Sequence, residues 1–211
     1  MKRVINLDNW NRKEHFKFFS ALDDPFWGIT TTVDFTSIYQ QSKNREVSFF
    51  LYSVHFLLKC INATTAFKLR IENGEVVEYD KINISPTIGR EDGTFGFGFF
   101  EYDTDLSLFI ENAEKEIHRV KNSTGLSFSK DTARADVIRY SALPWFAFSE
   151  MKHAGSIQTG DSIPKISTGK LIQEKKKLLL PISISVHHGL VDGRNVAEFI
   201  QNVKDGQNNT L

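Results

Sequence analysis

The junction between an apolar strand and an amphipathic helix constrains this chain more than any other feature. The run Leu178–Val186 (LLLPISISV) predicts a strand, and residues 195–203 predict a helix. Between them lies the segment His187–Gly193 (HHGLVDG), which contains two adjacent histidines and an aspartate. An imidazole at the mouth of a strand-to-helix turn is placed for proton transfer, because it exchanges a proton close to neutral pH.

Side-chain alternation along this strand separates the two histidines. His187 shares the polar face with Ser183 and Ser185, and a strand extended by two residues places His188 on the apolar face. Partial burial there keeps His188 neutral and basic, as a general base requires. Two alternatives stay open: the histidines only end a strand, or they bind a metal. The metal is disfavoured, because adjacent strand residues point to opposite faces and no Cys-His cluster accompanies them.

Hydrophobic periodicity over the rest of the chain predicts strands and helices in mixed order. Asn73-Gly74 predicts a tight hairpin turn, and phenylalanines alternate with glycines from 95 to 99 as in a strand. The order does not repeat a strand–helix–strand unit, which favours an α+β fold. The expected helices are 11–22, 36–42, 48–62 and 105–120, and the further strands are 29–35, 67–72, 75–80, 82–88 and 137–141.

Composition bounds the class of protein. The 211 residues fit one domain, 1–211, and 26 basic residues balance 26 acidic ones, so no net field favours nucleic acid or an anionic membrane. No run approaches the length of a membrane span, and the N-terminus has no apolar signal region. The single cysteine, Cys60, excludes an internal disulfide and suits a reducing cytoplasm. The lysines 175–177 predict a solvated hairpin tip.

Four segments together resemble one enzyme family. The H-H-x-x-x-D-G pattern of His187–Gly193 resembles the signature of the coenzyme A-dependent acyltransferase superfamily. Asn9–Phe16 (NWNRKEHF), Ser141–Trp145 (SALPW) and Leu178–Pro181 (LLLP) are similar to segments of chloramphenicol acetyltransferases, in the same order. The resemblance implies one copy of that fold: an α+β two-layer sandwich, a mixed sheet with helices on one side.

The resemblance also implies a reaction and its residues. Acetyl-coenzyme A would donate its acetyl group directly to a substrate hydroxyl in a ternary complex, without a metal. His188 corresponds to the general base and Ser141 to the donor that stabilises the oxyanion. Asp192, which could be read as the third member of a triad, corresponds instead to an aspartate that pairs with Arg12.

Resemblance assigns the acceptor pocket as well. Phe95 and Phe128 correspond to two phenylalanines that contact chloramphenicol, and Trp27 to another aromatic. Phe19 replaces a tyrosine that offers a hydroxyl, and His153 stands where an aliphatic residue is usual. Chloramphenicol is therefore the expected acceptor, although another hydrophobic alcohol, or a purely structural role for these phenylalanines, stays open.

On the donor side, Lys170 corresponds to a lysine near the 3′-phosphate of coenzyme A, and Ser167 replaces a threonine with polar contacts. Leu171 and Ser48 replace a tyrosine beside the adenine and a second lysine. The affinity for coenzyme A is therefore expected to be weaker than is usual in the family.

The size of the chain has a consequence for assembly. Condensation domains of this superfamily carry two copies of the fold and use the channel between them, whereas this chain has length for one. The resemblance implies a homotrimer, with His188 of one subunit facing the pocket of the next. A related acyltransferase for another alcohol, and a non-catalytic trimer that sequesters a hydrophobic ligand, are the competing hypotheses.

Overall fold

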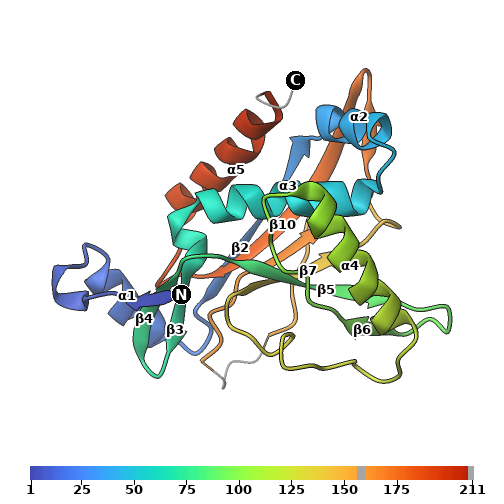
Figure 1. The fold of residues 1–211 in the computed structure, drawn as a ribbon. Helices are drawn as coiled ribbons and strands as arrows, with labels where there is room; N and C mark the ends of the chain where they lie inside the picture. Colours follow the sequence, from blue (N-terminus) through green and yellow to red (C-terminus); the bar gives the residue numbers. More distant parts are fainter. Residues whose placement is uncertain (156–159, 209–211) are drawn as a thin grey trace.

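A mixed β-sheet forms the centre of the molecule. The computed structural model describes residues 1–155 and 160–208, and in this part seven strands form one sheet in the order β2-β10-β8-β7-β5-β6, with β9 paired to β10 (Figure 1). β5, β7 and β8 run parallel, and the other pairs are antiparallel. The strands are β2 (Phe26–Asp34), β5 (Asn83–Gly89), β6 (Phe95–Phe97), β7 (Val137–Ala142), β8 (Lys165–Thr168), β9 (Ile172–Glu174) and β10 (Lys177–His187).

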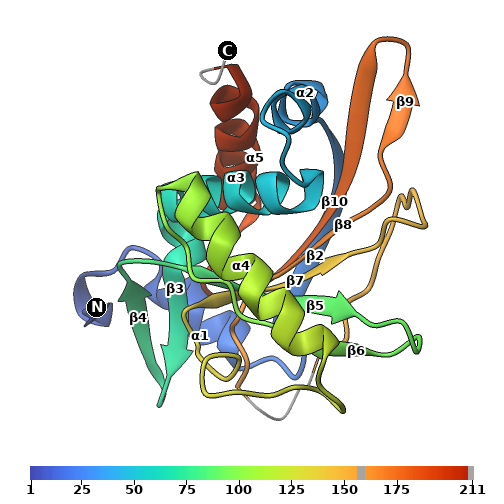
Figure 2. The same cartoon turned by 45° about the vertical axis from the view of Figure 1, so that its right-hand side comes forward.

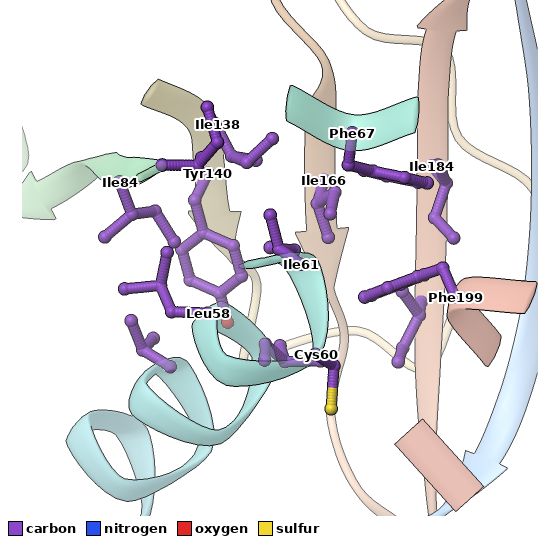
Figure 3. Packing of buried hydrophobic residues seen from close by; sticks show 14 of the residues in the cluster. Leu58, Cys60, Ile61, Phe67, Ile84, Ile138, Tyr140, Ile166, Ile184 and Phe199 are labelled. Carbon is purple, nitrogen blue, oxygen red and sulfur yellow. The ribbon is translucent and has the colours of Figure 1, made fainter. Parts of the chain in front are cut away.

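Helices cover one face of this sheet and enclose the core. The helices are α1 (Lys13–Ser20), α2 (Thr36–Asn44), α3 (Phe49–Ala63), α4 (Leu106–Lys121) and α5 (Gly193–Asn208), of which α3 and α4 cross the sheet in Figure 2. Figure 3 shows Ile61 of α3 facing Ile166 and Phe199 of α5 facing Ile184, with Leu58 of α3 beside Ile84 of β5. These side chains are at most 1% exposed, so burial of this face stabilises the fold.

The opposite face of the same strands is polar. Strand alternation that turns Ile166 and Ile184 to the helices turns Ser167 and Ser185 away from them. Ser141, Ser167 and Ser183 are register partners on β7, β8 and β10, so their hydroxyls form one row across three strands. This face carries the polar side chains that are available for binding and catalysis.

A proline separates the two strands that pair with the same edge of β10. Ile182 pairs with Thr168 of β8, and Leu179 pairs with Ile172 of β9, so Pro181 falls opposite the connection between them. Proline has no N–H to donate to a neighbouring strand. At this position no residue of β8 or β9 lies opposite Pro181 to accept such a hydrogen bond. β9 and β10 then continue as a hairpin that projects beside α2 (Figure 2).

A small sheet lies at the other end of the molecule (Figure 1). It has the order β1-β4-β3, with β1 at Lys2–Val4, β3 at Leu69–Glu72 and β4 at Glu75–Tyr79. Arg70 of β3 is fully buried and donates to the carbonyl oxygens of Phe67, Leu69, Ala135 and Val137. These bonds attach the small sheet to the start of β7.

Most elements expected from periodicity are present, with ends shifted by a few residues. The expected hairpin turns at Asn73 and Gly74, both with positive φ, and lysines 175–176 form the turn between β9 and β10. Strands β1, β8 and β9 have no counterpart in the expectation, because each has only three or four residues. Among the described helices, none has the length and apolar character that crossing a membrane requires.

Candidate active site

His188 lies directly after β10, between two aromatic rings. Its backbone N–H donates to the carbonyl of Pro25 over 2.8 Å, which extends the pairing with the β2 side by one residue. Its ring stacks on Phe19 of α1, with centroids 3.8 Å apart and planes 15° apart, and Trp27 of β2 lies 5.3 Å away. The half-buried imidazole is therefore fixed by packing.

The loop after His188 is closed by hydrogen bonds within the chain. The N–H groups of Leu190 and Val191 both donate to the carbonyl of His187 at 3.0 Å. The indole N–H of Trp27 donates to the carbonyl of Val191 over 2.9 Å. The same tryptophan thus contacts the imidazole and holds the loop that carries it.

Asp192 and Arg12 form an ion pair at the base of this loop. Arg12 also donates to the carbonyl of His188 over 3.2 Å, while the other Asp192 oxygen accepts the N–H groups of Arg194 and Asn195. Burial raises the pKa of Asp192, but the Asn195 amide and Arg12 outweigh it, so the pKa is lowered. Asp192 therefore begins α5 and anchors the loop, rather than contacting an imidazole.

Gly193 does not have the role that its place in the motif suggests. Gly193 has no positive φ, and a Cβ built there meets no atom within 4 Å, so the turn into the helix does not depend on glycine. Instead, the side chains of Asp192 and Asn195 cap each other's backbone N–H groups and make the turn.

The two histidines differ in the nitrogen that they present. Nδ1 of His188 is buried and has no hydrogen-bond partner among the described residues, which leaves Nε2 as its accessible nitrogen. Nδ1 of His187 accepts the N–H of Gly189 over 3.1 Å, so the proton of its neutral ring is on Nε2. Burial lowers the pKa of His187 to about 4, although Asp161 acts in the opposite direction. His187 is a fixed donor, whereas His188 has a free nitrogen.

Ser141 lies on β7 in a chain of hydroxyl groups. Thr87 of β5 donates to the Ser141 oxygen over 3.2 Å, which leaves the Ser141 proton available to another acceptor. Its register partner Ser167 is fully buried and lies 3.0 Å from Nε2 of His153. Burial and the charge of Lys165 both lower the pKa of His153.

An exposed aromatic cluster lies near the β5–β6 edge of the sheet. The Phe95 and Phe97 rings meet edge to face at 5.8 Å, and Phe97 stacks on Phe128 at 5.4 Å. Phe128 is 70% exposed and Phe95 is 48% exposed. We call these three residues the aromatic wall. Exposed rings of this size are unusual for a surface that faces water alone.

By strand register, His188 and Ser141 of one chain lie too far apart to act on the same reacting carbonyl. His188 lies five residues beyond Ser183, the β10 residue in register with Ser141 through β8. That offset is about 16 Å along the strand and about 10 Å across two strand spacings, so the Cα atoms are about 19 Å apart. Two side chains do not span this distance.

The structure therefore distributes the expected site residues over separate groups. Phe19 and Trp27 lie with His188, His153 and Ser167 lie beside Ser141, and Phe95 and Phe128 belong to the aromatic wall. Lys170 is exposed and follows β8. The role of Thr87 could not be predicted from the sequence, because only the pairing of β5 with β7 brings it to Ser141. Within the described residues, no group of three His, Cys, Asp or Glu side chains can hold a metal ion.

The fold is that of a wider class of acyltransferase structures. A probable dihydrolipoamide acetyltransferase from Listeria monocytogenes superposes with a TM-score of 0.69 at 13% identity, covering 98% of this chain and 94% of that one. At this identity the likeness concerns the fold alone. It shows that this mixed sheet, covered by helices on one side, recurs in that structure.

The family is defined by the sequence as a whole. The family model for chloramphenicol acetyltransferase matches residues 2–204, so the chain belongs to the chloramphenicol acetyltransferase family. Chloramphenicol acetyltransferase 3 of Escherichia coli is 27% identical over 208 residues, which are 98% of this chain and 97% of that protein. A solved chloramphenicol acetyltransferase superposes with a TM-score of 0.90 at 29% identity, covering 98% of this chain and 100% of that one.

Proposed function

We propose that this protein transfers the acetyl group of acetyl-coenzyme A to a hydroxyl of chloramphenicol. The fixed imidazole of His188, with Nε2 as its free nitrogen, is the observation that carries the proposal. Family membership supports the acceptor and the donor. Such a reaction would give resistance to the antibiotic in the cytoplasm, where a buried reduced Cys60 is stable.

The chemistry follows from the groups available. Nε2 of His188 takes the proton of the acceptor hydroxyl while that oxygen attacks the thioester carbonyl. Ser141, whose oxygen accepts from Thr87, donates its proton as a hydrogen bond to the oxyanion. When the intermediate collapses, the carbon–sulfur bond breaks and the proton on His188 passes to the departing thiolate. The products are the acetyl ester and coenzyme A.

We also propose that each active site is shared between copies of the chain in a homotrimer. The separation of about 19 Å between His188 and Ser141 supports this arrangement. The aromatic wall supports it too, because its exposed phenylalanines are suited to contacting a hydrophobic acceptor or a second copy. In this arrangement the residues 1–211 act as one acyltransferase domain, and His188 of one subunit faces Ser141 of the next.

The donor side of the site would lie near β8. Lys170 is proposed to contact a phosphate of coenzyme A through its exposed ammonium, whereas Ser167, which was also expected to contact the cofactor, is fully buried against His153 and would act only through that residue. Phe19 and Trp27 beside the base, together with Phe95, Phe128 and His153, are proposed to contact the acceptor.

A complementation experiment tests the reaction and the shared site together. Purified His188→Ala and Ser141→Ala chains are each assayed with acetyl-coenzyme A and chloramphenicol, using a thiol indicator. The two chains are then unfolded, mixed and refolded. Sites shared between subunits regain activity in the mixture, because some interfaces combine an intact His188 with an intact Ser141. A mixture no more active than its components would contradict sharing, and an inactive wild type would contradict the reaction.

A further inference from the structure

A cavity of about 700 Å³ lies on the polar face of the sheet, beside the row of hydroxyls described above. Phe26 and Trp27 of β2 line it together with Met151, so part of its wall is apolar. His187, Lys165 and Asp161 also line the cavity and give it polar groups.

Lys165 is a buried cation with little compensation. Its side chain is 7% exposed, and its Nζ lies 3.4 Å from Asp161 and 4.3 Å from the centre of the Phe26 ring. The same Asp161 oxygen accepts a shorter bond, 2.7 Å, from Arg139. Two cations therefore share one carboxylate. Within the described residues the Lys165 ammonium makes no hydrogen bond, although a buried ammonium gains most from one.

His187 adds a second donor to the same cavity. The Gly189 N–H occupies its Nδ1, so the N–H on Nε2 is the group left for a ligand. The Phe26 ring lies between the two donors, 5.9 Å from the His187 ring and in contact with the Lys165 ammonium. Donors on either side of an apolar ring suit a ligand with an acceptor group on a flat body.

The remaining charges of the cavity lie at its rim. Asp24, Glu150 and Lys152 line it and are exposed, so water screens them. The buried end is different, because Lys165 and Asp161 are each only 7% exposed, and Asp161 is shared with Arg139, whose side chain is 49% exposed. A ligand carboxylate would give the Lys165 ammonium the close hydrogen bond that the shared Asp161 does not give it.

We propose that this cavity binds the carboxylate of an alcohol acceptor, with Lys165 as the residue that selects it. That the bound molecule is an acetyl acceptor rests on the proposed acetyl transfer. That a carboxylate binds rests on the residues of the cavity alone. Lys165 donates to the carboxylate, His187 contributes its Nε2–H, and Phe26 and Trp27 pack on the body of the molecule. The acceptor range of this chain therefore includes hydroxylated carboxylic acids of aromatic size.

Two matched probes test the charge preference directly. The binding of para-(hydroxymethyl)benzoate and of its neutral amide, para-(hydroxymethyl)benzamide, to the wild-type protein is measured by titration calorimetry without acetyl-coenzyme A. We expect the benzoate to bind about ten-fold more tightly, which corresponds to about 1.4 kcal/mol. Equal affinities for the two probes would overturn the proposal without use of any variant.

Two variants then assign the preference to Lys165. Lys165→Met is expected to reduce the preference to less than about two-fold, and Lys165→Arg to retain most of it, since a charged donor remains. A preference that survives in Lys165→Met would overturn the assignment. If Lys165→Met does not fold by circular dichroism, the wild-type pair and Lys165→Arg decide, because a preference lost in the charge-retaining variant would also contradict it.

The acetylation assay keeps the two proposals distinguishable. Wild-type protein that acetylates chloramphenicol but binds both probes equally refutes the carboxylate site alone. Protein that prefers the benzoate but acetylates no alcohol refutes the proposed reaction alone.

Discussion

The His188 loop and the aromatic wall are built in opposite ways. His188 is held by stacking on Phe19, by Trp27, and by the Arg12–Asp192 pair below the loop. In the aromatic wall, by contrast, Phe128 is 70% exposed and Phe95 is 48% exposed. The chain thus preorganises the proposed base by itself, while the surface proposed to meet the acceptor stays open.

This difference indicates where the free energy of each region comes from. Stacking, hydrogen bonds and an ion pair fix the His188 loop during folding, so damage there is expected in both stability and rate. The exposed rings of the aromatic wall contribute little to the free energy of folding, because they stay in contact with water in the folded chain. Its contribution is expected only when a ligand or a second copy covers it.

The largest expected effect tests the loop. His188→Ala should lower kcat/KM for chloramphenicol acetylation by about 10³-fold, within the range of general-base removal. Ser141→Ala should lower it by about 10²-fold, as for loss of one oxyanion donor. Single-turnover acetylation measures both, with melting temperature as the control for lost stacking on Phe19. Equal and mild losses would rule out these roles.

Acid should weaken the His188 loop through its neighbour. The pKa of His187 is lowered to about 4, while the unfolded chain has a histidine pKa of about 6.5, so the unfolded state binds the extra proton between these values. Stability is therefore fully present above about pH 6.5 and declines toward pH 4, by about 3 kcal/mol from this group. Urea unfolding of wild type and His187→Gln across this window should give a shallower pH dependence for the variant. Parallel curves would contradict it.

The ion pair below the loop should matter less than either histidine. Asp192→Asn should lower the free energy of unfolding by about 1–2 kcal/mol, less than for a fully buried pair, because Asp192 is 35% exposed. The acetylation rate should fall with it, since Arg12 also holds the His188 carbonyl. Asp8→Asn is the matched control, because Asp8 pairs with Lys13 at 82% exposure and should cost little. An unchanged melting temperature for Asp192→Asn would contradict the anchoring role.

The smallest effect on stability is expected at the aromatic wall. Phe128→Ser should change the free energy of unfolding by less than about 0.5 kcal/mol, as for an exposed side chain. It should nevertheless raise KM for chloramphenicol several-fold, whereas Leu108→Ser, a 45% exposed position on α4, should not. Steady-state kinetics and urea unfolding measure both. A stability loss as large as that of Asp192→Asn would remove the contrast between the two regions.

Much of the fold was predictable because its signals are local. The periodicity of residues 48–62 and 178–186 predicted the buried helix α3 and the strand β10, and Asn73-Gly74 predicted the hairpin between β3 and β4. Strand β8 was not predictable, because four residues carry no decisive period and its strand character comes from pairing with β7 and β10. Missing this strand in the prediction matters, because Lys165 and Ser167 lie on it.

By itself, the sequence determined the family, the polar and apolar faces of β10, and the candidate roles of His188, Ser141, Arg12 and Asp192. These conclusions depend on residue identity and on alternation along one segment. Only the tertiary structure decided that Thr87 reaches Ser141, that Lys165 is buried beside Asp161, and that His188 lies five residues beyond the β10 residue in register with Ser141. Strand order and register set those distances, and both arise from pairing between segments far apart in the chain, which no local pattern encodes.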